Sequence, residues 1–425
     1  MKIKAPRGTI DFLPGRIELW QYIQEVSREV FSRYGYAEIN TPIFEYTELF
    51  LRGIGDTTDV VSKQMYTFTV KDDKSYTLRP EGTASVVRSY LEHGLGAAPQ
   101  PVKLFYIGPI FRHERPQKGR YRQFHQLGAE AIGSQDPALD AEMIVMSMEI
   151  LQKLGLGNFL VNINSIGCPV CRPTYRQALR DHISPSLAKV CPTCQERFEK
   201  NPLRILDCKI AACKEVADGA PKSIDYLCPE CQTHYAQVCE YLDAFKITYR
   251  QNDLLVRGLD YYTKTVYEVE SLDLGAQSAL SGGGRYDGLV AELGGPATPA
   301  VGFASGMERI LLVLEEQGIK SPHSTAVDVF VISLGDAVRT QALVITQQLR
   351  QAGLKVETDY LGRSMKSQMK QADRLGAKYV LILGEDELAK GVVQVRDMQD
   401  SAQTEVPLSQ VVDRLSQNAQ QPAKA

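Results

Sequence analysis

Apolar residues recur at helical spacing close to the start of the chain, at Ile17, Trp20, Ile23, Val26, Val30 and Phe31. Residues three and four apart share one face of a helix, so the pattern predicts a helix over 17–34, ended by the Tyr-Gly-Tyr sequence. Runs rich in branched and aromatic residues predict strands at 37–44, 65–71 and 75–79. Further helices are expected from about 82 to 92 and over 137–154. Strands broken by hairpins and helices in this order favour a mixed, mainly antiparallel sheet.

A basic loop separates two strand-like segments within this region. The segments KLFYIGPIFR and RQFHQLGAEAI are typical of antiparallel strands, and the RPQKGR sequence between them contains Pro and Gly. From Arg112 to Arg122 the chain carries five Lys or Arg and one acidic residue, against a formal net charge of -3 for the whole chain. Arginine binds phosphate through paired hydrogen bonds, and Phe124 offers a flat face to a base. The hairpin is therefore either an anion-binding site or a solvated basic loop.

Two more groups of elements follow. The strand pattern resumes at 254–269 and 276–281, passes through the Gly-Gly-Gly-Arg-Tyr sequence, and precedes a helix that begins near Gly306. Over 326–415, strand-like and helical runs alternate, which predicts a small α/β domain with a largely parallel sheet and a last helix at 407–415. Residues 318–325 link this domain to the main body. The tail 416–425 is expected to be flexible.

Composition is that of an ordinary globular protein. The 425 residues are 44% hydrophobic and 23% charged, and no apolar run approaches the roughly 18 residues that span a bilayer. The N-terminal sequence MKIKAPRGTIDFLPG lacks the apolar core of a signal peptide. We therefore expect a cytoplasmic protein with no membrane partner. Its cysteines should then be reduced thiols or metal ligands rather than disulfides.

All nine cysteines lie within 168–245, a segment of many charges and helical stretches that interrupts the sheet pattern. We interpret it as an inserted, largely helical subdomain. Three C-x-x-C pairs occur here, and 19 residues separate the first two, Cys168 with Cys171 and Cys191 with Cys194. This spacing is typical of a ribbon-like structural zinc site. Buried free thiols and a redox role are the alternatives that the sequence leaves open.

Three polar clusters elsewhere carry candidate chemistry: the sequences RPEGT at 79–83, RGLDYY at 257–262 and GFASGMER at 302–309. Small residues before Arg309 would let a ligand approach the backbone, and this arginine falls in the first turn of a helix. The GFASGMER and RGLDYY clusters also have plain structural interpretations. These are a Gly-rich turn with a surface arginine, an ion pair between Arg257 and Asp260, and a packed pair of tyrosine rings.

Taken in order, these motifs resemble those of the class II aminoacyl-tRNA synthetases, and specifically the histidine–tRNA ligase family, over residues 1–415. EINTPIFE, which contains Pro42, resembles the dimer-forming first motif, FRHERPQKGRYRQF the second and GFASGMERILL the third. LRPEGTA, HQLGAEAIG, RGLDYYTKTVYE and SGGGRYDGL resemble the family segments that surround the histidine substrate. The resemblance implies a catalytic core formed by 1–167 and 246–320, an insert at 168–245 and an anticodon-binding domain at 326–415.

The resemblance also implies roles for individual residues. The catalytic residues would be Arg112, Arg257 and Arg309. ATP would be bound by Arg112, Glu114, Arg120, Arg122, Phe124 and Arg309, with Phe124 and Arg309 on the two faces of adenine. Histidine would be bound by Glu81, Gly82, Thr83, Gln126, Glu130, Arg257, Tyr261, Tyr262 and Tyr286. Within this set, Glu130 and Tyr262 are the pair expected to recognise the two imidazole nitrogens.

The implied reaction is the ATP-dependent ligation of L-histidine to its tRNA through a histidyl-adenylate. ATP would bind with Mg²⁺, and Arg257 would stabilise the five-coordinate phosphorus as charge develops. The first motif implies a homodimer. The C-terminal domain has a basic side suited to tRNA phosphates, although a solvated face explains each residue nearly as well. Its residues are Lys355, Arg363, Lys366, Lys370, Arg374 and Lys378.

One rival belongs to another functional class. A catalytically inactive relative of this family serves as the regulatory subunit of ATP phosphoribosyltransferase, and it would lack the anticodon domain and the phosphate-binding arginines. Both are present in this sequence. A general nucleotide-binding module is a second alternative, but it leaves the C-terminal domain unexplained. The sequence therefore favours a catalytic synthetase over both alternatives.

Overall fold

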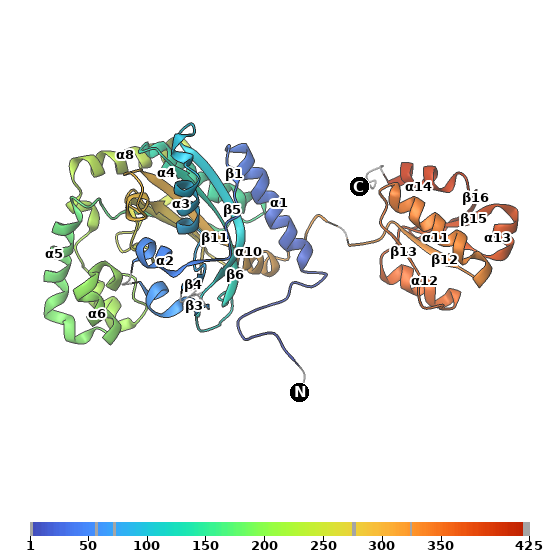
Figure 1. Ribbon diagram of the computed structural model, residues 1–425, viewed down its shortest axis with the longest axis horizontal. Coiled ribbons are helices and arrows are strands. Elements are labelled where there is room, and N and C mark those ends of the chain that lie inside the picture. Colours follow the sequence, from blue (N-terminus) through green and yellow to red (C-terminus); the bar gives the residue numbers. More distant parts are fainter. Residues whose placement is uncertain (1–2, 56–57, 71–73, 274–277, 324, 420–425) are drawn as a thin grey trace. The chain divides into compact units, whose positions relative to one another are not determined.

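The computed structural model describes residues 3–55, 58–70, 74–273, 278–323 and 325–419. The chain forms two compact units, 1–320 and 321–425, which are described separately (Figure 1). None of the described helices is long and apolar enough to cross a membrane. The expected flexible tail begins inside the last helix of the structure, and its residues 420–425 lie outside the described part of the chain.

An eight-stranded sheet forms the centre of the first unit. Its only parallel pairs among the described strands are β1 with β5 and β7 with β8, at the two edges, so the mixed, mainly antiparallel prediction is confirmed. The basic hairpin is its longest antiparallel pair, from Val102 opposite Ile132 to Phe111 opposite Gln123. In spatial order the strands are β1 (Ala37–Glu38), β5 (Val102–Phe111), β6 (Gln123–Ile132), β11 (Ala300–Gly306), β10 (Ala279–Arg285), β9 (Thr263–Ser271), β7 (Phe159–Ser165) and β8 (Tyr249–Gln251).

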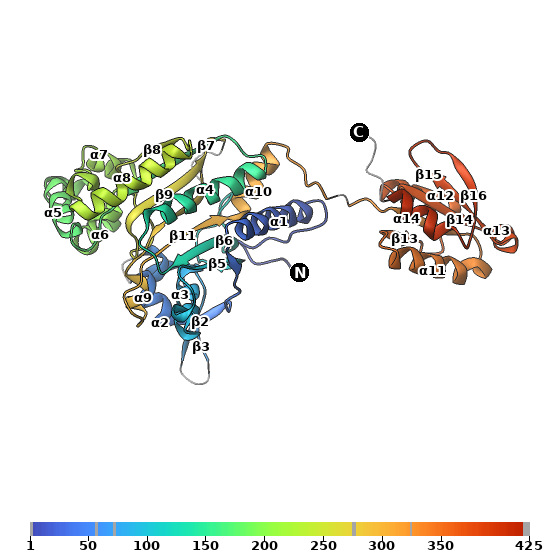
Figure 2. The same ribbon diagram turned by 90° about the horizontal axis from the view of Figure 1, so that it is seen from above.

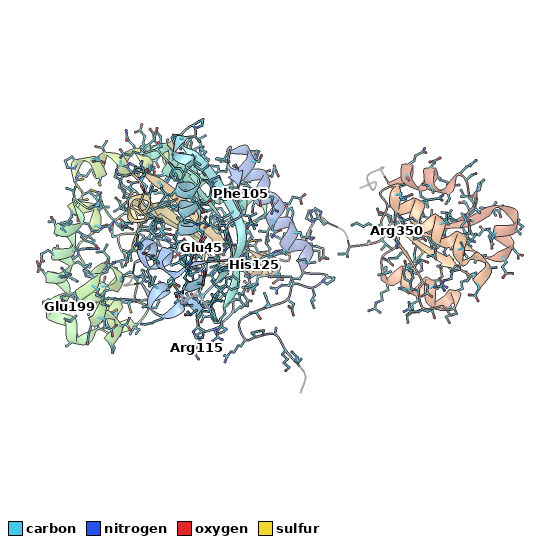
Figure 3. The ribbon with its side chains drawn as sticks, viewed as in Figure 1. Glu45, Phe105, Arg115, His125, Glu199 and Arg350 are labelled. Carbon is cyan, nitrogen blue, oxygen red and sulfur yellow. The ribbon has the colours of Figure 1, made fainter. Side chains whose placement is uncertain are left out.

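Three helices cover one face of this sheet: α1 (Ile17–Arg33), α4 (Pro137–Lys153) and α10 (Met307–Glu316) (Figure 2). The six apolar residues that predicted α1 are buried or partly buried in the core between α1 and the sheet. Phe31 stacks on Phe105 of β5 with ring centroids 4.6 Å apart. Figure 3 labels Phe105 among the side chains of the first unit. The core between these helices and the sheet is apolar, and the candidate site lies on the other face of the sheet.

A three-stranded sheet packs beside the main one, in the order β2 (Phe44–Tyr46), β4 (Ser75–Leu78) and β3 (Tyr66–Thr69). It is accompanied by α2 (Thr47–Ile54), a π-helical turn at Val60–Gln64, α3 (Thr83–Glu92) and a 3₁₀ turn at Leu95–Ala97. The single strand expected at 37–44 is therefore divided between two sheets. Pro42 lies in the gap, where it can donate no backbone hydrogen bond to a ladder.

The insert between β7 and β8 is largely helical, as predicted. It comprises α5 (Arg172–Ile183), α6 (Pro192–Lys200), α7 (Ala211–Ala217) and α8 (Pro229–Ala244), with 3₁₀ turns at Ser184–Lys189, Pro202–Ile205 and Ser223–Tyr226. Helices α5, α6 and α8 each follow directly on a cysteine and carry Pro in the first turn, where its missing N–H costs nothing.

The strand predicted at 254–269 begins only at Thr263, because residues 254–262 form a loop. The strand predicted at 276–281 instead continues through the glycines to Arg285, while 276 and 277 lie outside the described residues. Glycine is favoured here by packing: a Cβ at Gly283 would lie 2.2 Å from the carbonyl oxygen of Gly302. The short helix α9 (Leu289–Glu292) follows.

The second unit has a mixed sheet in the order β13 (Val356–Thr358), β12 (Val329–Ser333), β14 (Tyr379–Leu383), β15 (Val392–Asp397) and β16 (Gln403–Pro407). The first three strands are parallel, but β15 and β16 are antiparallel, so the largely parallel prediction is wrong for this half. Asp397 and Asp400 each accept a backbone N–H within the β15–β16 turn, at 2.8 Å. The helices are α11 (Asp336–Gln351), α12 (Met365–Arg374), α13 (Glu385–Lys390) and α14 (Val411–Ala419), the last starting four residues later than predicted.

Candidate active site

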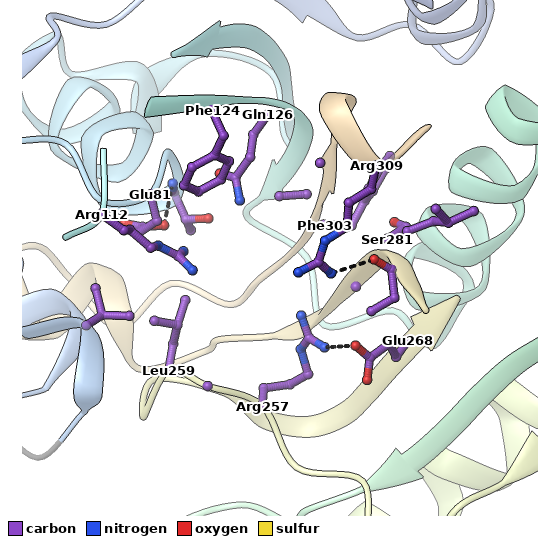
Figure 4. A pocket seen from close by; sticks show the side chains of 18 of the residues that line it. Glu81, Arg112, Phe124, Gln126, Arg257, Leu259, Glu268, Ser281, Phe303 and Arg309 are labelled. Atoms are coloured by element: carbon purple, nitrogen blue, oxygen red, sulfur yellow. Dashed lines mark hydrogen bonds and ion pairs between the residues drawn. The ribbon is translucent and has the colours of Figure 1, made fainter. Parts of the chain in front are cut away.

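A cavity lies on the sheet face opposite α1 and α4 (Figure 4). Its floor is formed by strands β6, β9, β10 and β11, and its walls by the basic hairpin, the start of α3, the loop 257–262 and the start of α10. Of the site residues predicted from the sequence, eleven line it: Glu81, Thr83, Arg112, Glu114, Arg120, Phe124, Gln126, Arg257, Tyr261, Tyr262 and Arg309.

The hairpin positions Arg112 at the end of β5. Its Nε donates to the carbonyl oxygen of Pro80 at 2.8 Å, and its guanidinium carbon lies 5.5 Å from the centre of the Phe124 ring. Arg120 forms a 2.9 Å ion pair with Glu114. Arg122 does not line the cavity, because its Nε donates to the carbonyl oxygen of Glu114 and its stem packs on Gly8.

Arg309 enters the cavity from the first turn of α10. Its Nη1 donates to the carbonyl oxygen of Ala279 at 2.7 Å. The preceding residue, Glu308, accepts from the backbone N–H of His125 and thereby joins α10 to β6. Burial lowers the pKa of both Arg112 and Arg309, so an anion between them would replace hydration that these guanidiniums have lost.

Arg257 points into the cavity from the opposite side (Figure 4). Its Nη1 lies 3.5 Å from Glu268 Oε1 on β9, and this is its ion-pair partner. A Cβ at Gly282 would come within 2.4 Å of its Nη2, so the glycine strand makes room for the guanidinium. Asp260, the partner considered from the sequence, accepts from Asn201 of the insert at 2.8 Å.

The carboxylates form a second layer. Glu81 accepts from the backbone N–H groups of Thr83 and Ala84, each at 2.7 Å, at the start of α3. Glu130 is fully buried behind the cavity wall, where Thr83 Oγ1 lies at 2.7 Å and Tyr286 OH at 2.5 Å from its oxygens. Burial raises the pKa of Glu130 to about 8. A carboxyl with this pKa is mainly neutral at pH 7.

Three other predicted histidine or ATP residues also lie away from the wall. Tyr286 is buried beside Glu130, Arg122 turns toward Gly8, and Gly82 provides space rather than contact. A Cβ at Gly82 would meet the Tyr106 ring at 2.3 Å.

The cavity also has polar residues that the sequence did not predict, among them Tyr106 and Ser281. Tyr106 OH and Ser281 Oγ are buried without a hydrogen-bond partner among the described residues, as are Gln126 Oε1 and Arg257 Nε. Buried polar atoms are normally paired, so these four mark places for a polar ligand. Strand alternation from Phe124 and Gln126 across the hairpin register could have identified Tyr106, which pairs with Gly128.

The cysteines group differently from the expectation. The first C-x-x-C pair meets the third, and the second meets Cys208 and Cys213, so the proposed ribbon of Cys168, Cys171, Cys191 and Cys194 does not form. The two groups are Cys168, Cys171, Cys228 and Cys231, and Cys191, Cys194, Cys208 and Cys213. Each has the composition of a tetrahedral metal site.

The sequence has full-length relatives. The family model described as histidyl-tRNA synthetase matches residues 8–310, and the one described as anticodon binding domain matches 328–418. A histidine–tRNA ligase of Desulforamulus reducens is 55% identical over 412 residues, covering 97% of this chain and 98% of that protein. One from Bacillus cytotoxicus is 53% identical, covering 96% and 97%.

The chain belongs to the histidyl-tRNA synthetase family. It is thus a histidine–tRNA ligase of class II with a C-terminal anticodon-binding domain, as the motifs predicted. The crystal structure of apo Staphylococcus aureus histidyl-tRNA synthetase matches it with a TM-score of 0.83 at 41% identity, covering 98% of this chain and all of that one.

The fold also occurs in a Bacillus halodurans protein described as an ATP phosphoribosyltransferase regulatory subunit/histidyl-tRNA synthetase. That likeness, at 21% identity with a TM-score of 0.65, is one of fold alone. The close relatives extend through the anticodon-binding domain, which favours the catalytic synthetase over the regulatory subunit.

The buried carboxyl of Glu130 predicts a pH-dependent stability difference. Because its folded pKa lies above that of an exposed glutamate, the unfolded chain releases this proton first as pH rises. The protonated Glu130 carboxyl contributes fully to the free energy of unfolding below a pH of about 4.5, and this contribution is lost as the pH rises through 8. We expect Glu130→Gln to gain stability over the wild type, on the order of 1 kcal/mol per pH unit in that interval.

The measurement is urea unfolding followed by fluorescence of Trp20, the single tryptophan of the chain, in the first unit. Glu240→Gln, at an exposed position, should follow the wild type at every pH. Parallel pH profiles for Glu130→Gln and wild type would contradict the buried neutral carboxyl.

Proposed function

We propose that the cavity binds ATP and L-histidine together and forms histidyl-adenylate. The observation that supports this most strongly is the convergence of Arg112, Arg257 and Arg309 on one cavity from three different elements. Three guanidiniums suit a substrate with several phosphates. The histidine carboxylate would attack the α-phosphorus, pyrophosphate would leave, and the adenylate would then pass its histidyl group to the terminal ribose of tRNA, with release of AMP.

On the ATP side, Arg112 would hold the α-phosphate while Phe124 and Arg309 enclose the adenine ring. Glu114 would meet the adenine edge, and Arg120 would turn from Glu114 to the outer phosphates. Mg²⁺ would enter with ATP and neutralise phosphate charge, and the carboxylates of Glu114 and Glu268 on the cavity wall are of the oxygen type that it prefers. Arg122 lies apart, so its role would be to hold the hairpin.

On the histidine side, Glu81, Thr83 and Gln126 would receive the amino group. Tyr262 would recognise one imidazole nitrogen from the wall, with Tyr261 beside it at a ring distance of 4.7 Å. Glu130 would recognise the other. Because Thr83 and Tyr286 now occupy its two oxygens, one of these hydroxyls would have to release Glu130 when histidine enters.

Catalysis would come from position and charge. A group that acts as a general base is not needed, since the attacking carboxylate is already ionised at neutral pH. Arg257 reaches into the cavity past Gly282 of β10 and would stabilise charge on the five-coordinate phosphorus.

We propose the same assignment of domains that the sequence predicted. Residues 1–167 and 246–320 would form the catalytic core, 168–245 the insert and 326–415 the anticodon-binding domain. Helix α12 presents Lys366, Lys370 and Arg374 as an exposed stripe at spacing of four residues, which suits tRNA phosphates. Charging of tRNA and reduced cysteines both fit a cytoplasmic protein.

A homodimer is proposed through the small sheet β2–β4–β3. Ile43, Phe44 and Tyr46 are 46–54% exposed there, beside Phe68 at 42%. Such a patch is unusual on a monomer. The carbonyl oxygen of Ile43 also accepts the backbone N–H of Arg79 at 2.8 Å, so a partner copy would support the segment that carries Glu81.

The assigned activity predicts amino-acid-dependent pyrophosphate exchange with histidine alone among the twenty amino acids. A chain ending at Ser321 should retain this exchange, since every cavity residue precedes it, and should lose most tRNA charging. Pyrophosphate exchange that proceeds equally with every amino acid would refute the proposed function.

A full-length variant tests, without truncation, whether the second unit serves tRNA charging but not pyrophosphate exchange. Changing Lys366, Lys370 and Arg374 to Glu should leave exchange intact and reduce both tRNA affinity and its salt dependence. Full charging by either protein would show that the second unit does not bind tRNA.

Arg257 gives the sharpest mechanistic prediction. Arg257→Ala should slow adenylate formation roughly 100- to 10,000-fold, about 3–5 kcal/mol, because its contact strengthens as the phosphorus becomes five-coordinate. Transfer from pre-formed adenylate should be less affected. Single-turnover kinetics at saturating ATP and histidine separate the two steps. A raised KM for histidine with an unchanged adenylation rate would make Arg257 a binding residue only.

The dimer is tested by Phe44→Asp. A charge in the patch should shift the solution mass from twice the chain mass of 47.2 kDa toward once that value, as measured by sedimentation. Leu361→Asp, at a 71% exposed position in the second unit, is the matched control and should change nothing. A wild-type monomer at micromolar concentration would rule the dimer out.

A further inference from the structure

The insert contains two compact groups of four cysteines that the reaction does not use. In each group the four sulfur atoms all lie within 4.8 Å of one another. In the first, the Sγ–Sγ distances are 3.7 Å from Cys168 to Cys171, 3.9 Å from Cys168 to Cys228, and 3.8 Å from Cys171 to Cys231. A tetrahedral zinc ion with Zn–S bonds of about 2.3 Å requires sulfurs about 3.8 Å apart.

The surrounding backbone is arranged for sulfur as well. Gly167 has a φ of +69°, and a Cβ there would lie 2.6 Å from Cys171 Sγ, so only glycine leaves room for that thiol. The backbone N–H of Cys168 donates to Cys171 Sγ at 3.1 Å. In the second group, the N–H of Cys191 donates to Cys213 Sγ at 3.2 Å. Both N–H groups thereby hold these sulfur atoms at fixed positions inside their groups.

Ordinary core packing does not account for these groups. A spare thiol packs as a small apolar side chain and has no need of three others at tetrahedral spacing. The ninth cysteine, Cys239, is of that ordinary kind, since it packs against the main core and belongs to neither group. Four-sulfur tetrahedral sites select zinc or an iron–sulfur cluster. Helix-capping C-x-x-C pairs in a small subdomain favour structural zinc.

Each group is connected to one end of the segment 257–264, which consists of the loop 257–262 and the first two residues of β9 and carries Arg257, Tyr261 and Tyr262. Beside the first group, Arg172 donates from Nη2 to the carbonyl oxygen of Tyr262 at 2.5 Å. Gly167 accepts the backbone N–H of Lys264 at 2.9 Å. The far end of the loop is thus attached to the segment 167–172.

The second group is connected to the near end of the loop. Residues 195–207, between its cysteines, include Arg204, whose Nη1 donates to the carbonyl oxygen of Arg257 at 2.8 Å. Asn201 donates to Asp260 at 2.8 Å. Arg204 is itself 7% exposed, so its guanidinium is fixed in place.

We propose that the insert binds two zinc ions, one in each four-cysteine group, and that they hold the segment 257–264 in its active position from both ends. The zinc sites stand on the sulfur geometry alone. The positioning role rests on the proposed function, because it assumes that this loop contacts histidine and the α-phosphate.

Metal content tests the first part. The full-length protein, purified without added metal or chelator, should contain two zinc ions per chain by mass spectrometry, and X-ray absorption should show four sulfur neighbours at about 2.3 Å. Titrating its thiols with a mercurial should release both ions to a chromophoric chelator. Cys168→Ser with Cys171→Ser, and separately Cys208→Ser with Cys213→Ser, should each leave one ion, whereas Cys239→Ser keeps two.

Three results would overturn the zinc sites: titration of all nine thiols without release of metal, the visible absorption of an iron–sulfur cluster, or an unchanged zinc content in the double variants. The mercurial titration uses wild-type protein and so remains decisive even where a double variant fails to fold.

Positioning is tested at Arg204, which touches no zinc ligand in the proposal. The Arg204→Met variant should retain two zinc ions and the hydrodynamic radius of the wild type. Its kcat for histidine-dependent exchange should nevertheless fall at least 10-fold, with little change in the KM for ATP. Arg204→Lys should restore part of that loss. Unchanged kinetics with two bound zinc ions would sink the positioning role while leaving both the metal sites and the proposed function standing.

Discussion

A single buried ion pair joins the parts that build the site. Arg285, at the end of β10, is completely inaccessible to solvent and lies 2.7 Å from Asp140 of α4. Its other donors reach the carbonyl oxygens of Ser134 and Asp136, each at 2.9 Å, before the helix begins. Asp140 also binds His234 of the insert at 3.1 Å. Sheet, helix and insert therefore share one network.

Burial alone would raise the pKa of Asp140, but the adjacent Arg285 and His234 lower it, so the carboxylate stays charged. Removing one member of such a pair typically costs about 3–5 kcal/mol, because the other charge is left buried and unmatched. The glycines that admit Arg257 directly precede Arg285 on β10. The shape of the cavity floor thus depends on a contact outside the cavity.

Sequence patterns predicted local structure well where one periodicity dominated. The apolar stripe of α1 and the alternating strands around the basic loop are formed as expected, because their apolar faces alone decide what they bury. Patterns failed where distant contacts decide. Residues 254–262 look like a strand but form a loop because the insert binds their backbone. The first two C-x-x-C pairs do not share a group, since α8 returns Cys228 and Cys231 to the first pair.

The same distinction applies to the site. Residue types revealed the arginines, four of which line the cavity, but not the depth at which each side chain lies. Alternation in β6 assigns Gln126 and Glu130 to one face, yet only Gln126 reaches the cavity. Thr83 and Tyr286 stand in front of Glu130, and both come from segments remote in sequence.

The bare backbone of the cavity floor limits how this enzyme could evolve. A Cβ at Gly302 would fall 1.8 Å from Glu130 Oε2, and one at Gly282 would strike the Arg257 guanidinium. A side chain at either position would therefore displace Glu130 or Arg257, two residues proposed to contact the substrate. Change in specificity is therefore expected first in the walls, where Leu259 and Tyr262 have side chains to vary. The floor is a fixed boundary around which the rest of the pocket can diverge.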